Sequence, residues 1–373
     1  MENYAIIATF ADPREAYYFR FKLGIEGIDA YIIETEKKEN GEIIPLQVQV
    51  NLKNVEKAID LLCEMRMAKD FQNIEEKIKN IRRILVPIDF SDYSYSAALF
   101  AFSIAKSINA EIKLLHVFKD PFMGGTFLGN RTSYENFTKN VMNEIFQMAQ
   151  NNMVLFIDKL KQKLKEYNLE DVSYHYVLQK GKPEYQIVKI SETYKPYMIV
   201  LGTKGVGQMP GDLIGSVTLK VIENTTVPIL AIPEEWEFKG LDKLNVLYAT
   251  DFQDSDFTAF NKLLDILKPF KVKLECVHIE TDEKNPWKEM QLFKLESYLN
   301  ENYEEDIKCH MIKNDDLFAG IQEYVDKMNI DIISFTSPKR SIVYKLLYPN
   351  NLKKMVYQSK IPLLIFHSNI KST

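Results

Sequence analysis

A nine-residue pattern occurs twice in this chain and constrains the fold more than any other feature. Residues 84–92 read ILVPIDFSD and residues 246–254 read VLYATDFQD, with four of nine positions identical. At the same offset of 162 residues, His116 in KLLHVF corresponds to His278 in LECVHI. Similarity at a fixed internal offset predicts two diverged copies of one domain.

The last segments of the two units also correspond. TTVPILAI at 225–232 corresponds to SKIPLLIF at 359–366, an offset of 134, so the second copy is 28 residues shorter in its middle. We therefore place the copies at 81–233 and 244–368. The length of 373 residues agrees with more than one domain, since a domain usually has about 100–200 residues.

Each copy alternates short apolar runs with helical patterns. Such alternation predicts parallel strands with helices on both faces. The expected fold class is therefore α/β, with two tandem, doubly wound, five-stranded parallel sheets. In the first copy the expected strands are 83–89, 111–118, 172–178, 198–203 and 227–232, and the longest helical patterns cover about 135–166, 184 onward and 215–224.

The segment before residue 80 has a different pattern. Tyr4–Phe10 predicts a strand, and Asp12-Pro13 is typical of a helix start. Two further strands and a second helix follow, so residues 1–70 predict a small α+β domain. Its remaining expected elements are strands at 30–34 and 46–52 and a helix at 55–65; the expected linkers are 66–80 and 234–243.

Composition excludes several classes of protein. The net charge of −5 and the pI of about 5.7 argue against a nucleic-acid or anionic-membrane partner. No run approaches the roughly 18 apolar residues of a membrane span, and the start does not resemble a signal peptide. Three distant cysteines do not form a disulfide framework. These features predict a cytoplasmic protein.

The most informative chemical motif lies at 198–216, MIVLGTKGVGQMPGDLIGS. Its glycines follow a strand and its Gly215-Ser216 pair opens a helix, an arrangement that favours a phosphate group. A Walker A motif is absent, and Pro210 stands where a dinucleotide-binding motif needs glycine. A glycine-rich turn without a ligand remains the alternative interpretation.

The spacing Gly202-x2-Gly205-x9-Gly215-Ser216, together with ILVPIDFSD, LLHVF and VPILAI, strongly resembles the universal stress protein family over residues 81–233. The resemblance implies a Rossmann-like α/β domain that binds ATP or AMP, with or without Mg²⁺, and a role in stress response. It assigns the adenosine contacts to Pro87, Asp89 and Val117. It places Leu201 and Gly202 beside the nucleotide and Gly205, Gly215, Ser216 and Val217 around the phosphates.

The second copy departs from this pattern. Aligning Ile332–Pro338 with 199–205 places Phe335 at the first glycine and Pro338 at the second. Ala249 replaces Pro87, and Pro349-Asn350 stands at the Gly215-Ser216 position. Phenylalanine and proline cannot provide the open backbone that phosphates need. We therefore expect the second copy to be a degenerate domain that does not bind ATP in the same way.

The resemblance also implies partners. Family members pair along their final strand, so we expect the two copies to form an intramolecular pseudo-dimer, and two chains can pair again. Residues 1–70 resemble a small prokaryotic domain named for a role in signal transduction, which implies a protein partner of unknown identity. The first functional hypothesis is accordingly a nucleotide-binding regulatory protein.

Two alternatives stay open. One is an enzyme, either a slow ATPase or an adenylyl-transfer enzyme, although no catalytic set accompanies Asp89. The other is an interaction scaffold that needs no nucleotide. A zinc site from Cys276, His278, Cys309 and His310 is disfavoured, because adjacent residues of a strand point to opposite faces. His116 and His278 are expected to have a structural role.

Overall fold

The computed structural model describes most of the chain outside a few connecting segments and the two ends. The described residues are 4–10, 12–34, 46–67, 82–122, 131–205, 215–233, 236, 243–250, 254–280, 286–302, 307–315, 317–337 and 361–367. In these residues no helix is long and apolar enough to cross a membrane.

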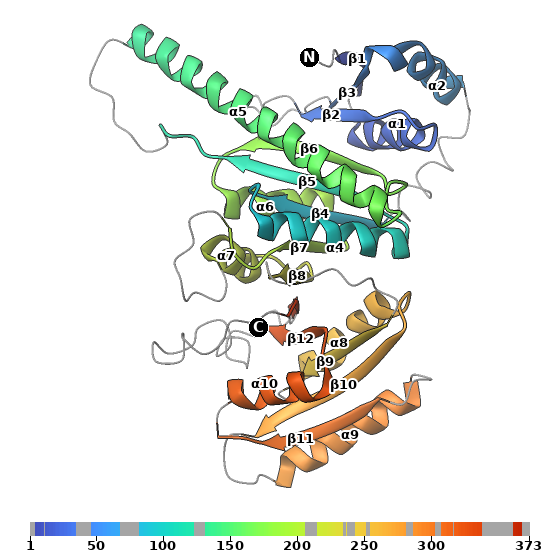
Figure 1. Cartoon of the computed structure of the whole chain (residues 1–373), viewed down its shortest axis with the longest axis vertical. Helices are drawn as coiled ribbons and strands as arrows, with labels where there is room; N and C mark the ends of the chain where they lie inside the picture. Colours follow the sequence, from blue (N-terminus) through green and yellow to red (C-terminus); the bar gives the residue numbers. More distant parts are fainter. Residues whose placement is uncertain are drawn as a thin grey trace.

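Ten strands form one large mixed sheet, in the order β11-β10-β9-β12-β13-β8-β7-β4-β5-β6 (Figure 1). The first half of this sheet comes from residues 82–233 and is parallel throughout. Helices α4 and α5 pack on one face and α6 and α7 on the other. The elements of this half are β4 (Arg82–Ile88), α4 (Asp92–Ile108), β5 (Ala110–Phe118), α5 (Arg131–Glu166), β6 (Tyr174–Lys180), α6 (Pro183–Tyr194), β7 (Met198–Gly202), α7 (Ser216–Asn224) and β8 (Ile229–Ile232).

The second half, residues 243–367, has the same strand order counted from its own start. Its first strand lies between its second and fourth, as in the first half. Its elements are β9 (Leu244–Ala249), α8 (Asp254–Leu267), β10 (Val272–Glu280), α9 (Pro286–Asn302), β11 (Lys308–Lys313), α10 (Leu317–Met328), β12 (Ile332–Ser337) and β13 (Leu363–His367).

The two five-stranded sheets expected from the sequence are joined by β8 and β13 into one ten-stranded sheet. They pair antiparallel, with Leu230 opposite Leu364. A final strand with no neighbour would leave a row of backbone hydrogen-bonding groups unpaired, and pairing the two final strands removes both edges. This is also why the sheet is mixed rather than parallel.

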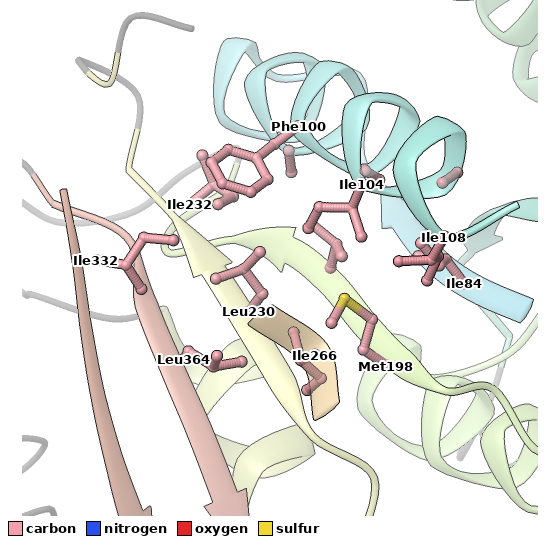
Figure 2. Packing of buried hydrophobic residues seen from close by; sticks show 14 of the residues in the cluster. Ile84, Phe100, Ile104, Ile108, Met198, Leu230, Ile232, Ile266, Ile332 and Leu364 are labelled. Carbon is pink, nitrogen blue, oxygen red and sulfur yellow. The ribbon is translucent and has the colours of Figure 1, made fainter. Parts of the chain in front are cut away.

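The hydrophobic core continues across the β8–β13 junction on both faces of the sheet. Figure 2 shows α4, β7, β8, β12 and β13 contributing side chains to one apolar layer. Phe100 and Ile104 come from the first half, and Ile266 and Leu364 come from the second. These four residues help to line an apolar cavity of about 20 Å³, close to the volume needed by one water molecule. The two halves therefore share a core.

A separate three-stranded antiparallel sheet, in the order β1-β3-β2, forms the N-terminal domain. Alternate residues of β3 are buried, and α1 and α2 contribute to the same core cluster. This domain has the βαββα order expected from the sequence. Its elements are β1 (Tyr4–Phe10), α1 (Pro13–Ile25), β2 (Ala30–Glu34), β3 (Leu46–Asn51), the short 3-10 helix η1 (Leu52–Asn54) and α2 (Val55–Met67).

The N-terminal domain contacts the outer strands of the first half through buried charges. Arg20 of α1 donates to Oε2 of Glu111 over 2.7 Å, and both side chains are almost fully buried. Lys113 donates to the Tyr17 hydroxyl over 2.8 Å. At the sheet edge, the centroid of the Tyr31 ring of β2 lies 5.2 Å from that of the Tyr176 ring of β6. The α1 helix therefore covers polar strand residues that would otherwise face solvent.

Candidate functional site

The candidate site lies where β4 and β7 separate. Their paired register stops at Leu85 and Ile199, three residues before each strand ends. The pairing of β4 with β5, in contrast, continues to the last residue of β4. In a doubly wound sheet, ligands bind outside the carboxyl ends of strands at the point where the strand order reverses. The separation of β4 and β7 lies at that point.

A tight turn after β4 fixes the position of Asp89. Its Oδ1 accepts bonds from the Ser91 backbone N–H at 3.1 Å and the Ser91 hydroxyl at 2.5 Å. Oγ of Ser91 in turn accepts the Ser94 N–H at 3.2 Å, which makes Ser91 the N-cap of α4. Phe90 between them has a positive φ of 67°. The side chain of Asp89 is thereby held at the mouth of the site.

At Gly205 and Gly202, a side chain would collide with its surroundings. A Cβ on Gly205 would overlap Oδ2 of Asp89, so the loop after β7 passes directly over this carboxylate. A Cβ on Gly202 would lie 2.7 Å from Cβ of Tyr93 in the first turn of α4. The structure thus brings Asp89, Gly202 and Gly205 together from two strand ends.

The start of α7 supplies the other side of the loop. Gly215 is buried and caps the helix without a side-chain bond, and its N–H donates to the Thr203 carbonyl over 2.7 Å. Ser216 is exposed and Val217 is half-buried. A helix start of this kind presents backbone N–H groups and the positive end of the helix dipole. Residues 206–214 lie outside the described residues.

The remaining predicted residues lie within the strands. Pro87 is buried opposite Leu115, while Val117 and Leu201 are buried in the cluster on the α6–α7 face. They form the apolar floor below the turn and the glycine loop rather than a polar contact surface. Sequence reasoning missed two supporting residues, Tyr93 and Thr218, of which Thr218 donates to the Gly202 carbonyl over 2.9 Å. Neither belongs to a recognisable motif.

His116 and His278 make the same bond in the two halves. Nδ1 of His116 donates to the Ile88 carbonyl at 3.0 Å, and Nδ1 of His278 donates to the Thr250 carbonyl at 2.8 Å. The His116 ring also packs on Phe90, with 4.2 Å between centroids. Burial lowers the pKa of His116 below its usual value. Both imidazoles tie the end of one strand to the next.

The strand register corrects the expected correspondence in the second half. The Ile199 N–H donates to the Pro228 carbonyl, and the Ile333 N–H donates to the Pro362 carbonyl, so Ile333, not Ile332, occupies the position of Ile199. The position of Gly202 is therefore taken by Thr336, whereas Phe335 matches Leu201. The connection before this strand has the same length in both copies, since the left-handed residues Lys195 and Asn329 lie four residues before Ile199 and Ile333. The offset here is therefore 134, as for the final segments, and the alignment of Ile332 with residue 199 was one residue out. Pro338, Pro349 and Asn350 lie outside the described residues.

The second half also differs in geometry at this position. Pairing of β9 with β12 continues to Ala249 and Phe335, the former being the last residue of β9. The hydroxyls of Tyr248 and Thr336 form a buried hydrogen bond of 2.7 Å across these strands. The separation seen between β4 and β7 is thus absent between β9 and β12.

The four residues considered for zinc do not converge. Cys276 lies opposite Cys309 in the register of β10 and β11, and both are buried. His310, on the other face, bonds Oε2 of Glu275 through Nε2 at 3.1 Å. Within the described ranges, no three His, Cys, Asp or Glu side chains are grouped as metal ligands.

Comparison with known proteins gives the same domain as the sequence motifs. Residues 80–233 match the family model described as the universal stress protein family. A universal stress protein of Methanocaldococcus jannaschii is 32% identical over 152 residues, covering 40% of this chain and 81% of the relative.

One solved structure shows a shared fold. A universal stress protein of Archaeoglobus fulgidus has a TM-score of 0.55 at 17% identity, covering 77% of this chain and 96% of its own. A match of that extent reaches beyond residues 80–233. A universal stress protein in complex with cAMP has a TM-score of 0.28 at 18% identity, covering 42% of this chain and 98% of its own. From the identity with the M. jannaschii protein and the matched family model, the chain belongs to the universal stress protein family.

Proposed function

We propose that the first half binds an adenine nucleotide, ATP or AMP, where β4 and β7 separate. The observation that carries this proposal is the passage of the Gly205 backbone over the Asp89 carboxylate at the mouth of that separation. Family membership supports it, because the motif residues of the ATP-binding subgroup are all present. In this proposal Pro87, Asp89 and Val117 contact the adenosine, with Leu201 and Gly202 beside it.

The phosphates occupy the start of α7 in this proposal. Gly205 and Gly215 leave space for them, and the N–H groups of Ser216 and Val217 donate to their oxygens, because the N–H of Gly215 already donates to the Thr203 carbonyl. The Ser216 hydroxyl is exposed and adds a further donor. A Mg²⁺ ion bound to the phosphates would reduce their charge. Helix N-termini favour anions because they present backbone N–H groups and the positive end of the helix dipole.

We propose further that the second half is a diverged copy that acts as an intramolecular partner. Its strand order matches that of the first half, and the β8–β13 pairing supplies the pseudo-dimer contact. The continued β9–β12 pairing and the Tyr248–Thr336 bond fill the space that a nucleotide would need. The N-terminal domain then carries a signal between the nucleotide site and a protein partner in the cytoplasm.

Calorimetric titration of ATP with Mg²⁺, and of AMP, into nucleotide-free protein tests the proposal. We expect one site per chain. Gly205→Ala should weaken binding at least about tenfold, about 1.4 kcal/mol, because the new Cβ overlaps Asp89. Gly24→Ala is the matched control, since its Cβ would meet only Ser173 Oγ at 3.8 Å. Two sites per chain would show that the second half binds as well.

The double variant Asp89→Ala/Gly205→Ala separates steric from chemical effects. It removes the collision between the new Cβ and Asp89 but also removes the Asp89 carboxylate. Nucleotide binding should therefore stay weak, while the free energy of unfolding should return to that of Asp89→Ala. Failure of the parent protein to bind ATP or AMP would favour the scaffold. Steady phosphate release, or transfer of the adenylyl group to an acceptor, would favour the enzyme.

A further inference from the structure

The N-terminal domain and the ten-stranded sheet have separate hydrophobic cores. Among the described residues, the core cluster of this domain runs from Ala8 to Met65 and includes no residue of the sheet or of the helices that pack on it. The two halves of the sheet, in contrast, share their core. Contacts between domains of this kind resemble transient interfaces between proteins. The N-terminal domain can therefore separate from the sheet without opening either core.

Two contacts at the rim of this interface are weak. The Tyr31 ring of β2 packs on Tyr176 of β6. Lys161 of α5 lies 3.6 Å from Asp29, and these side chains are 45% and 67% exposed. Solvent screens an exposed ion pair, which contributes little to stability. The attachment of the domain therefore depends mainly on the buried contacts of α1.

His175 of β6 lies inside the buried part of the interface. Its ring is fully buried, with centroids 5.4 Å from that of Tyr17 of α1 and 6.1 Å from that of Tyr194 of α6. Neither ring nitrogen has a hydrogen-bond partner. The Tyr17 hydroxyl accepts from Lys113, and the Tyr194 hydroxyl donates to Glu111. A protonated imidazole, which has two N–H donors, would be a buried charge with no acceptor, so the docked domain requires the neutral ring.

The charged groups around His175 also disfavour a proton on its ring. Three cations face it, Arg20 from α1, Arg83 from β4 and Lys113 from β5. The Glu111 carboxylate of β5 bonds Arg20 at 2.7 Å and lies 3.9 Å from Arg83. Three cations against one carboxylate leave the cluster positive. Burial, together with the three cations, holds the pKa of His175 well below its usual value.

We propose that a proton on His175 releases the N-terminal domain from the first half, so that this interface is a pH-sensitive switch. When α1 leaves the sheet, water reaches the imidazole and the cations around it. The hydrated ring binds a proton more readily than the buried ring, so acid favours the released domain. The equilibrium constant for release then rises by up to about tenfold for each pH unit below about 6.5. The cores of the domain and of the sheet stay intact.

A distance measurement between the two parts of the full-length, nucleotide-free protein tests the proposal. Spin labels at Leu52→Cys of η1 and Tyr185→Cys of α6 occupy positions that are 51% and 62% exposed. Cys63→Ser removes a competing thiol, and Cys276 and Cys309 are buried. Pulsed electron resonance should give one distance at pH 7.5. A second, longer distance should grow between pH 6.5 and 5. A parent that keeps one distance down to pH 5 would overturn the proposal.

Two replacements of His175 show whether its ring is the group that responds. His175→Phe keeps an aromatic ring and His175→Gln keeps a polar side chain, but neither titrates, so both should lack the longer distance at pH 5.5. His310→Phe is the matched control, because His310 of β11 is 41% exposed and lies at the opposite edge of the sheet (Figure 1). It should release the domain like the parent.

The remaining outcomes of this comparison contradict the proposal. If the longer distance persists at pH 5.5 in both His175 variants, another group controls release. If His310→Phe abolishes release as fully as the His175 variants do, the effect is not specific to the interface. If both His175 variants are already released at pH 7.5, the ring is needed for packing rather than for its response to protons.

Discussion

At the scale of single residues, Ser91 supports both a helix and the candidate site. Its hydroxyl donates to Asp89 and accepts the Ser94 N–H. We expect Ser91→Ala to lower the free energy of unfolding by about 1 kcal/mol through loss of the N-cap. It should also weaken nucleotide binding, because Asp89 loses a donor that fixes it. Urea denaturation and calorimetry measure the two effects.

The same helix provides the control for this prediction. Ser107 lies in the last turn of α4 and donates only to the Ser103 carbonyl, at 3.1 Å. Ser107→Ala should change the free energy of unfolding by less than about 0.5 kcal/mol and leave nucleotide affinity unchanged. If Ser107→Ala lowers the free energy of unfolding and the nucleotide affinity as much as Ser91→Ala does, the N-cap and the Asp89 turn have no specific effect.

The glycine positions were predictable from the sequence, but the reasons for them were not. Spacing identified Gly202 and Gly205, and the strand pattern located them after β7 within a residue. Their contacts with Tyr93 and Asp89 depend on how α4 approaches β7, which is a tertiary property. The correspondence of Gly202 with Thr336, rather than Phe335, follows from the 134-residue offset of the final segments, which the alignment of Ile332–Pro338 did not use.

At the scale of elements, Arg20 of α1 connects the N-terminal domain to β5. Replacing it with methionine leaves the buried Glu111 carboxylate without its closest cation, which typically costs about 3–5 kcal/mol. We expect Arg20→Met to raise hydrogen exchange in α1 and β6 sharply. Arg20→Met/Glu111→Met should recover much of the loss, because a buried pair can be replaced by apolar groups of similar volume.

A surface ion pair of the same domain serves as the comparison. Lys57 and Glu26 are 3.4 Å apart, with side chains 58% and 45% exposed. Lys57→Met should cost less than about 1 kcal/mol, since solvent screens an exposed pair. If Arg20→Met behaves like Lys57→Met, the buried pair does not hold α1 to the first half.

His175 of β6, which packs against Tyr17 of α1, makes the stability of the protein depend on pH. Its ring is fully buried between Tyr17 and Tyr194, and neither ring nitrogen has a hydrogen-bond partner. Burial, with the positive charges of Arg20, Lys113 and Arg83, holds the pKa of His175 well below 6.5. The unfolded chain therefore binds the proton more readily, and the free energy of unfolding falls as the pH drops below about 6.5.

The variant His175→Phe isolates this effect, since it keeps the aromatic contacts and removes the titrating group. Its free energy of unfolding should fall less steeply between pH 6.5 and 5, by up to about 1.4 kcal/mol per pH unit for one proton. Burial lowers the pKa of His116, and burial with Lys262 nearby lowers that of His367 to about 4, so some dependence on pH remains. Identical slopes for parent and variant would contradict the prediction.

At the scale of the whole molecule, the α/β class and the order of elements followed from hydrophobic patterns, whereas the pairing of the two final strands was implied only by the family resemblance. VPILAI and IPLLIF each predict a buried final strand. Nothing in either segment specifies its neighbour, because backbone groups pair with any strand that reaches them. The docking of the N-terminal domain was also unpredictable, since Arg20 and Glu111 are 91 residues apart.

The continuous sheet and shared core make the two halves one cooperative unit, which gives a last prediction. Leu364 of β13 is 2% exposed and packs at the junction, opposite Leu230 of β8. Leu364→Ala should cost about 2–5 kcal/mol. Because the core is shared, the loss should shift unfolding of the first half as well as of the second.

Trp236 reports on the first half in this experiment, because its ring packs on Phe100 of α4 at 4.5 Å between centroids. Trp287→Phe leaves Trp236 as the sole tryptophan. In that background, fluorescence and far-ultraviolet circular dichroism should give the same urea midpoint. Leu364→Ala should lower the midpoint measured by both methods, and by the same amount. The exposed Leu52→Ala provides the control and should move neither. A fluorescence midpoint that stays fixed while the dichroism transition splits would show that the halves unfold independently, in spite of the β8–β13 pairing.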